Sequence, residues 1–334
     1  MHNGSSLFTG DAGQGESNIR RWIIENDWLE AIVALPLNMF YNTGIATYIW
    51  VLTNRKPEHR KGKIQLIDAT QWYKPLRKNL GKKNCELSEE EIQRICQTFL
   101  DFKETEQSKI FPNAAFGYWK VTVERPLRLR VELDAKSLAV FRAACEEEEE
   151  APVANLVERV SALLGPGPHL NFDTFMDEVE ADADKHNIKL TASRKKLLKD
   201  RLAKRDEKAA EVISKIYKAG KTKPDPLRGL FETTIKGKPC VVEYEPDSDL
   251  RDTEQIPLLE EGGIETFLRR EVLPHVPDAW YDAESVKTGY EISFTRYFYK
   301  PQPLRTLEEI RADILALEKE TEGLLGEIVG EKSR

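Results

Sequence analysis

The sequence predicts an α/β fold, with buried strands near the start, helices in the middle and a long helix at the end. Residues 30–35 and 48–52 form two nearly continuous apolar runs. Such runs are typical of strands that are covered on both faces of a sheet. Helical patterns dominate from about residue 145 to 224, and the last thirty residues repeat apolar positions at spacings of 3 and 4, as long packing helices do.

The two apolar runs are joined by a corner of unusual composition. Phe40 and Tyr41 stand beside Asn42, Thr43 and Gly44. Two aromatic rings next to polar, turn-forming residues can stack on a planar ring and hydrogen-bond it. The alternative is a tight corner between two buried strands.

The sequence before and after this corner continues the α/β pattern. Residues 16–26 predict a helix whose buried face carries Ile19, Trp22 and Ile23. The glycine-rich residues 10–15 ahead of it are interpreted as a loop rather than a cofactor cradle. Residues 64–68 alternate like a further strand.

Composition sets wide limits on function. A chain of 334 residues with 40% apolar and 32% charged residues can form two or three globular domains. We find no run of 18 apolar residues and no signal-peptide pattern at the N-terminus. Four cysteines without CxxC spacing argue against a zinc site or a disulfide framework and predict a cytoplasmic protein with no metal.

A basic segment stands out within this acidic chain, whose net charge is −7. Residues 54–84 contain ten lysines and arginines against two acidic residues. A local excess of this kind can contact phosphates, although it can also be a solvated loop. The candidate DNA-backbone residues are Arg55, Lys56, Arg60, Lys61, Lys63, Arg77 and Lys78.

The middle of the chain offers weaker signals. Five consecutive glutamates, residues 146–150, indicate a solvated linker or helix end. Two further helices are expected at 172–185 and 192–217, the second with basic flanks that are typical of a charged exterior face or of a DNA contact. Residues 289–299 mix aromatic and cationic side chains, which suits a packed core or a base-stacking surface.

The last helix predicts a partner. Its apolar positions form an a/d stripe interrupted by Thr321, and one such stripe must pack on this chain or on another subunit. The stripe consists of Leu307, Ile310, Ile314, Leu317, Leu324 and Ile328. The expected organisation is therefore 1–144, 145–224, 225–303 and 304–334, the last being a coiled-coil-like helix.

Several blocks together resemble a known family. They include the FYNTGI corner within residues 3–56, Gly117-Tyr118, the VERPL block at 123–127 and TGYEISFTRYFYKP at 288–301. The chain resembles the modification (methyltransferase) subunit of type I restriction-modification systems, a DNA adenine N6-methyltransferase family. The resemblance implies a Rossmann-like sheet of which these are the last strands, and S-adenosylmethionine as the cofactor. It also implies double-stranded DNA as the substrate, and specificity and restriction subunits as partners.

By the same resemblance, Phe40 and Tyr41 would hold a flipped adenine, and the terminal helix would bind the specificity subunit. Two motifs of the family have no counterpart here: its glycine-rich cofactor turn and its Asn-Pro-Pro-Phe/Tyr motif, since no Pro-Pro pair occurs. We therefore expect the C-terminal portion of the subunit, from a split or truncated gene, with no catalytic residue of its own.

Three hypotheses for this portion remain open. The chain completes a methyltransferase together with a separately encoded N-terminal fragment and does not bind the cofactor alone. It is instead a non-catalytic scaffold for the specificity subunit, or it is an inactive remnant of a split gene.

Overall fold

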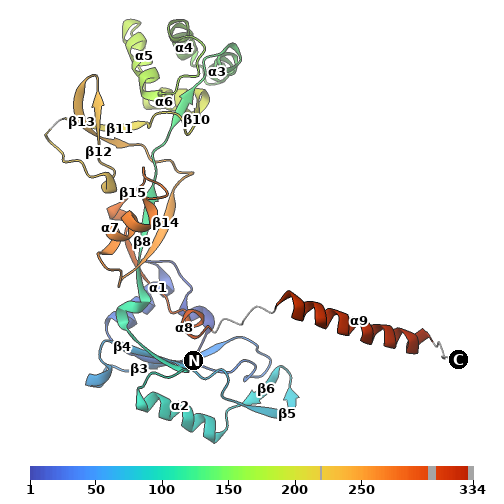
Figure 1. The fold of residues 1–334 in the computed structure, drawn as a ribbon. Helices are drawn as coiled ribbons and strands as arrows, with labels where there is room; N and C mark the ends of the chain where they lie inside the picture. The colour runs from blue at the N-terminus through green and yellow to red at the C-terminus, as the bar shows by residue number, and fades with distance from the viewer. Residues whose placement is uncertain (219, 300–305, 330–334) are drawn as a thin grey trace.

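The computed structural model describes residues 1–218, 220–299 and 306–329. The molecule is elongated: an N-terminal sheet lies at one end, a group of helices at the other, and a narrow strand-built region joins them (Figure 1). The fold is mixed α/β, as the sequence predicts.

The N-terminal body is built on a five-stranded sheet in the order β1-β3-β2-β4-β7. Its strands are β1 (His2–Asn3), β2 (Leu29–Ala34), β3 (Thr47–Leu52), β4 (Lys63–Asp68) and β7 (Ser108–Pro112). Only β2 and β4 run parallel to each other. Helices α1 (Gly15–Glu25) and α2 (Glu89–Asp101) pack on this sheet, and a two-stranded ribbon of β5 (Lys74–Leu80) and β6 (Lys83–Glu86) extends from it.

The strand predictions are correct, but the expected burial of the second strand is not. All six residues of β2 are buried, as a strand covered on both faces requires. Five residues of β3 are only half-buried and Leu52 is exposed. The reason is position: β2 lies inside the sheet, whereas β3 lies next to its short edge strand β1.

The face that helix α1 turns to the core only partly matches the prediction, because Ile23 packs on the core and the other two predicted residues do not. Ile19 and Trp22 are each 57% exposed, while Ser17, Arg20 and Ile24 are buried. Arg20 decides this orientation because its Nε donates to the carbonyl of Tyr290 at 2.6 Å and its Nη1 donates to the carbonyl of Ser6 at 3.1 Å. A buried guanidinium must find such acceptors, and hydrophobic periodicity alone does not reveal them.

The narrow region centres on β8 (Gly117–Glu124), which pairs antiparallel with three later strands. These partners are β14 (Asp252–Pro257), β15 (Trp280–Tyr281) and β16 (Lys287–Tyr290). Helix α7 (Gly263–Phe267) and the following π-helical turn (Leu268–Val272) cover the apolar residues of this sheet. The chain therefore leaves the N-terminal body along β8 and returns to it along β16.

The returning segment becomes part of the N-terminal core. Tyr290, Ile292 and Phe294 are buried in one cluster with residues of β2 and β4. This confirms the packed-core interpretation for Tyr290, Ile292 and Phe294. The segment does not continue as a strand, because α8 (Phe294–Phe298) follows it.

The far end consists of α3 (Ala135–Glu147), α4 (Ala151–Leu164), α5 (Phe172–Lys185) and α6 (Ala192–Leu202). The helix predicted over 192–217 is too long. After Leu202 the chain forms β10 (Ala203–Arg205), which pairs with β9 (Leu129–Val131), and then β11 (Ile213–Lys218). β11 joins β12 (Phe231–Ile235) and β13 (Lys238–Tyr244) in a sheet, since its branched and aromatic residues suit a strand.

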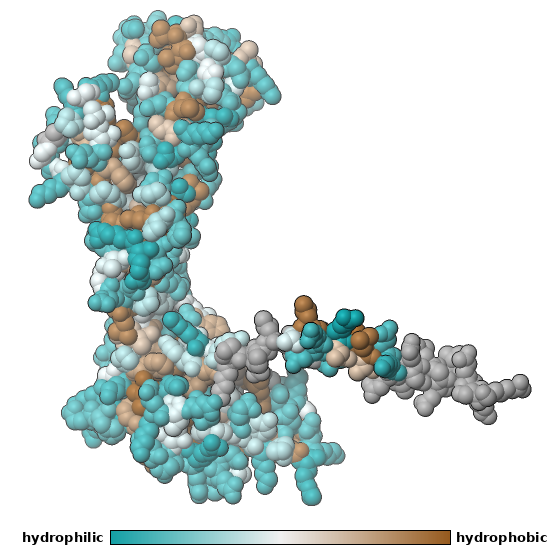
Figure 2. Space-filling model, viewed as in Figure 1, coloured by the Kyte–Doolittle hydropathy of each residue, from teal (hydrophilic) through white to brown (hydrophobic). Residues whose placement is uncertain are grey.

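Helix α9 (Leu307–Val329) projects away from the other elements, and apolar side chains are visible on its surface (Figures 1 and 2). Leu307, Ile310, Ile314 and Leu317 are exposed. The side chains of Leu324 and Ile328, which belong to the same predicted stripe, lie outside the described residues. Within the described chain, no helix is both long and apolar enough to cross a membrane.

The Arg20 contacts give a direct test of what holds α1 in place. Arg20→Met removes charge-assisted hydrogen bonds and leaves buried carbonyl groups unpaired, so we expect a loss of about 2–4 kcal/mol in the free energy of unfolding. Urea unfolding followed by tryptophan fluorescence measures it. The matched control is the neighbouring Arg21→Met, which removes only an exposed ion pair with Glu25 and should cost about 0.5 kcal/mol. Equal losses for the two variants would contradict this role of Arg20.

Candidate functional site

The carboxyl ends of the parallel strands β2 and β4 meet at one edge of the N-terminal sheet, where Ala34 pairs with Asp68. Because β3 is antiparallel to β2, its first residues reach the same edge. In open α/β sheets, ligands bind in crevices outside the carboxyl ends of the strands. This edge is therefore the first place to look for a site.

A cavity of about 450 Å³ lies at this edge. Four separate stretches of chain line it: the loop after β2, the start of β3, the loop after β4, and β6. The lining residues are Leu35, Leu37, Asn38, Ala46, Tyr48, Thr70, Gln71, Tyr73 and Asn84. Two phenol rings, three amides and an apolar floor can hold a flat ring and hydrogen-bond its edge.

Tyr48 contributes a neutral hydroxyl to this cavity. Burial raises the pKa of Tyr48, and the negative charge of Asp68 raises it further. Asp68 also fixes Thr70, because its Oδ1 accepts hydrogen bonds from the Thr70 amide at 3.0 Å and from the Thr70 hydroxyl at 2.6 Å. Tyr48 therefore remains protonated around neutral pH and can donate a hydrogen bond to a ligand.

The five corner residues lie beside the cavity. In the described chain, the residues that line the cavity come before and after the corner in the sequence. Phe40 packs on the core cluster that contains Val33 and Ile67. Tyr41 is 70% exposed, and Asn42 adopts a left-handed backbone with φ of 52°. Thr43 Oγ1 accepts a hydrogen bond from the amide of Ile45 at 3.4 Å. Tyr41 is thus the aromatic of the corner that is free to stack on a ligand.

Gly44 has a different role from the expected one. It is not among the glycines with positive φ, and Asn42 takes the left-handed position of this corner instead. A Cβ at Gly44 would lie 3.2 Å from Oδ1 of Asn38. Gly44 therefore leaves room for an amide that lines the cavity, rather than supplying an unusual backbone angle.

The basic segment divides into two groups at opposite ends of β4. Arg55, Lys61 and Lys63 are exposed near the start of this strand, roughly 17 Å of strand away from the cavity edge. Arg77 and Lys78 are exposed on β5, which begins directly after Tyr73. Only the second group lies at the edge that carries the cavity.

Two of the predicted DNA-backbone residues are buried. The Nζ of Lys56 forms a 2.5 Å ion pair with Asp27, and Arg60 lies 3.3 Å from Glu30. The Arg60 guanidinium also lies between the rings of Phe99 and Phe102, 4.1 and 4.3 Å from their centroids. These two cations stabilise the fold and cannot reach a phosphate, so we do not include them in a DNA surface.

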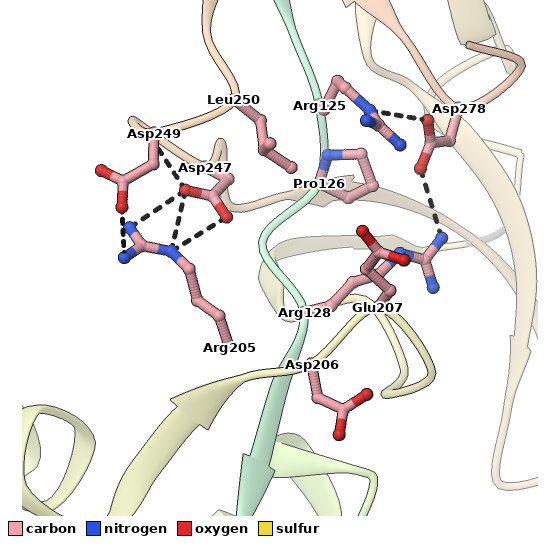
Figure 3. A pocket seen from close by; sticks show the side chains of 10 residues that line it. All are labelled: Arg125, Pro126, Arg128, Arg205, Asp206, Glu207, Asp247, Asp249, Leu250 and Asp278. Carbon is pink, nitrogen blue, oxygen red and sulfur yellow. Dashed lines mark hydrogen bonds and ion pairs between the residues drawn. The ribbon is translucent and has the colours of Figure 1, made fainter. Parts of the chain in front are cut away.

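A larger cavity, of about 580 Å³, lies where β8 leads into the helical end (Figure 3). Its three arginines are already bound by carboxylates. Arg125 and Arg128 contact Asp278 at 3.2 and 3.4 Å, and Arg205 contacts Asp247 at 3.0 Å. The arginines therefore join neighbouring segments of chain and are not available to hold an anion. Within the described residues, no group of His, Cys, Asp or Glu could hold a metal ion.

The glycine-rich loop before α1 is also occupied. Ala12 is fully buried, the carboxylate of Asp11 is bound to Lys120 at 2.7 Å, and a Cβ at Gly13 would lie 3.2 Å from the Lys287 side chain. The loop packs against β8 and β16. These contacts make the loop a structural connection between α1 and the two strands.

Sequence reasoning missed Tyr73, Asn38 and Asn84. Tyr73 follows the correctly predicted strand at 64–68. Its position after the carboxyl end of that strand could have indicated a ligand-binding residue. Asn84 had no such signal, because the β5–β6 ribbon that carries it was not predicted.

Comparison with known proteins shows which proteins the chain is similar to. Residues 1–117 match the family model N-6 DNA Methylase. The MjaIX methylase subunit of the type I restriction enzyme of Methanocaldococcus jannaschii is 38% identical over 172 residues, which cover 46% of this chain and 30% of that relative. The MjaVIII methylase subunit of the same organism is 30% identical over 154 residues, 45% of this chain and 24% of that relative.

The chain thus spans less than a third of the curated relatives it matches. A solved methyltransferase subunit of a type I restriction-modification system from Streptococcus thermophilus shares 20% identity, covers 34% of this chain and 22% of that chain, and has a TM-score of 0.29. The family match of residues 1–117 and these curated relatives confirm the predicted resemblance of the chain to type I restriction-modification methylase subunits.

Proposed function

We propose that this chain is a portion of the DNA adenine N6-methyltransferase subunit of a type I restriction-modification system. Its sheet would be the last part of a Rossmann-like methyltransferase sheet, and the complete domain would transfer a methyl group from S-adenosylmethionine to adenine. The match of residues 1–117 to the N-6 DNA Methylase family carries this proposal. The residues present here do not fit the cofactor, so cofactor binding is assigned to the complete domain.

The open edge of β3 supports the need for a further part. β2 pairs with β3 from Tyr48 to Leu52, whereas β1 pairs only with Thr47 and Tyr48. Thr47 accepts from the amide of Leu35, and Thr53 donates to the carbonyl of Trp28, so odd-numbered residues face β2. Because backbone direction alternates along a strand, Trp50 and Leu52 point their N–H and C=O groups toward the unpaired side.

An edge of this kind is a template for another strand. We propose that the N-terminal part of the methyltransferase, as a separately encoded fragment, adds a strand along Trp50 and Leu52. The same junction would place its cofactor and Asn-Pro-Pro groups next to the cavity edge. The role of this chain is then to complete the sheet and to hold the flipped adenine.

Mixing experiments test this assembly. The purified chain alone should not bind S-adenosylmethionine in a calorimetric titration, because its glycine-rich loop is packed. Addition of an upstream-encoded fragment with both missing motifs should give a stable complex, cofactor binding and methylation of DNA. Cofactor binding by the chain alone, or no binding after mixing, would contradict the proposal.

Leu52 provides a control for the way in which the fragment binds. Leu52→Pro removes the outward N–H and should prevent the fragment from binding, because proline cannot donate to a neighbouring strand. Leu52→Ala removes the exposed side chain but keeps the N–H, and should retain the complex. Equal binding by both variants in size-exclusion chromatography would exclude strand addition at β3.

Base holding is the second part of the proposed function. Tyr41 is exposed beside the cavity, and stacking on an aromatic side chain contributes about 1–3 kcal/mol per base. In the assembled enzyme, Tyr41→Ala should therefore lower kcat/KM for methylation by roughly 5- to 150-fold. Phe40 supports the corner from the core side, so Phe40→Leu should have a smaller effect.

The matched control is Tyr299→Ala, since Tyr299 is 68% exposed and Tyr41 is 70% exposed. Tyr299 follows α8 and lies outside the corner of residues 40–44, so its removal should leave methylation unchanged. Normal methylation by Tyr41→Ala would remove the stacking role.

A scaffold function is favoured by one further observation, the exposed apolar residues of α9. Leu307, Ile310, Ile314 and Leu317 are exposed. We propose that this face binds the specificity subunit, and that the restriction subunit joins the same assembly. The two functions are compatible, because α9 and the cavity edge are separate regions (Figure 1).

Paired aspartate substitutions test the face of α9 that is involved. Ile314→Asp places a charge in the stripe and should abolish recovery of the specificity subunit in a pull-down. Ala312→Asp adds the same charge two residues earlier, on the opposite face of the helix, and should leave recovery intact. Loss of binding in both variants, or in neither, would contradict a stripe-specific interface.

A further inference from the structure

The β5–β6 ribbon concentrates exposed positive charge. Residues 73–85 contain no acidic side chain. The cations of the ribbon are Lys74, Arg77, Lys78, Lys82 and Lys83. None of them has an ion-pair partner in the described part of the chain. Most arginines elsewhere are bound by carboxylates, as in the cavity of Figure 3.

The ribbon is held in a defined position on the corner loop. The amide of Asn84 donates to the carbonyl of Asn38 at 3.1 Å, and Sγ of the buried Cys85 lies 3.2 Å from the carbonyl of Leu37. At the tip, a Cβ on Gly81 would lie 2.1 Å from Oδ1 of Asn42, so the ribbon touches the corner there. Its cations therefore have a fixed location relative to the cavity, unlike those of a loose loop.

The outer strand of the ribbon is bulged at its cationic residues. Pro75 pairs with Cys85 and Leu80 pairs with Lys83, so four residues on β5 oppose one residue on β6. A bulge twists a strand and redirects the side chains at the extra positions. Arg77 and Lys78 lie in this bulge and are exposed.

The ribbon and the cavity share residues. Tyr73 and Asn84 line the cavity, Tyr73 directly precedes Lys74, and Asn84 lies within β6. A nucleotide whose base occupied the cavity would thus have its sugar and phosphates next to the ribbon. A nucleic acid fits this arrangement, because its backbone can contact the row of cations while a base fills the neutral, aromatic cavity. A flat anionic surface fits it less well, because such a surface has no group to fill the cavity.

We infer that the β5–β6 ribbon is a phosphate clamp for the DNA strand that donates its base to the cavity. Lys74, Arg77 and Lys78 contact the phosphates along β5, and Lys82 and Lys83 contact them near the tip. Tyr73 marks the point where the backbone contact ends and the base site begins. Arg77 and Lys78 were predicted to contact DNA from the sequence; Lys74, Lys82, Lys83 and Tyr73 are assigned by the ribbon's placement. This inference rests on the proposed function only for the identity of the polyanion.

Salt-dependent DNA binding tests the clamp without cofactor or methyl transfer. The full chain is titrated with a fluorescently labelled DNA duplex at several salt concentrations, and the slope of log K against log salt is measured. The triple variant Lys74→Gln/Arg77→Gln/Lys78→Gln should reduce the magnitude of this slope by about 3, since each phosphate contact contributes about one. Its affinity at low salt should fall by roughly tenfold or more.

The matched control is Lys136→Gln/Lys185→Gln/Lys189→Gln, which makes the same change in charge at exposed positions of the helical end. It should leave the slope unchanged. An unchanged slope in the ribbon variant, or an equal decrease in both variants, would overturn the clamp. A ribbon variant that loses binding to vesicles containing phosphatidylserine but keeps its DNA affinity would overturn it as well.

The result also separates the clamp from the proposed function. DNA binding through the ribbon with no methylation after mixing would contradict the methyltransferase and leave the clamp standing. If the assembled enzyme methylates DNA but the ribbon variant keeps the salt slope of the unaltered chain, the clamp is contradicted and the methyltransferase proposal stands.

Discussion

The buried contact between α1 and the returning chain is the constraint on which the N-terminal body depends. Arg20 and Tyr290 are 270 residues apart in sequence, and Ser17 Oγ adds a second contact by accepting from the Tyr290 amide at 3.2 Å. Everything between β8 and β16 is inserted between the two halves of this junction. The narrow region and the helical end can therefore extend far from the sheet while both ends of the insertion stay fixed.

This junction also explains why the cavity edge is well defined. The segment that returns along β16 brings Phe294 against Tyr48, with ring centroids 5.1 Å apart. Tyr48 is thereby supported by a distant part of the chain, and the negative charge of Asp68 acts on its hydroxyl. Side chains held on rigid strands keep the geometry that recognition of a planar ring requires.

The elements that could be predicted from the sequence are those that depend on local sequence patterns. The strands at 30–35 and 48–52 follow from apolar runs, and the strand at 64–68 follows from alternation. The orientation of α1 could not be predicted, because a buried arginine overrides hydrophobic periodicity. The end of the helix at Leu202 could not be predicted either, because pairing of β10 with the distant β9 decides it.

The candidate site shows the same division. Charge counting identified the basic segment, but only tertiary structure distinguishes Arg60, enclosed by two aromatic rings and Glu30, from Arg77, exposed on a bulged strand. The corner motif identified the family, but the cavity is lined by the residues around it. The corner therefore acts mainly as a support: Gly44 leaves space for Asn38, Asn42 turns the chain, and the ribbon packs on both. A base held here would be contacted by groups from four segments. In the proposed assembly, the groups that act on its amine would come from the part that adds a strand along Trp50 and Leu52.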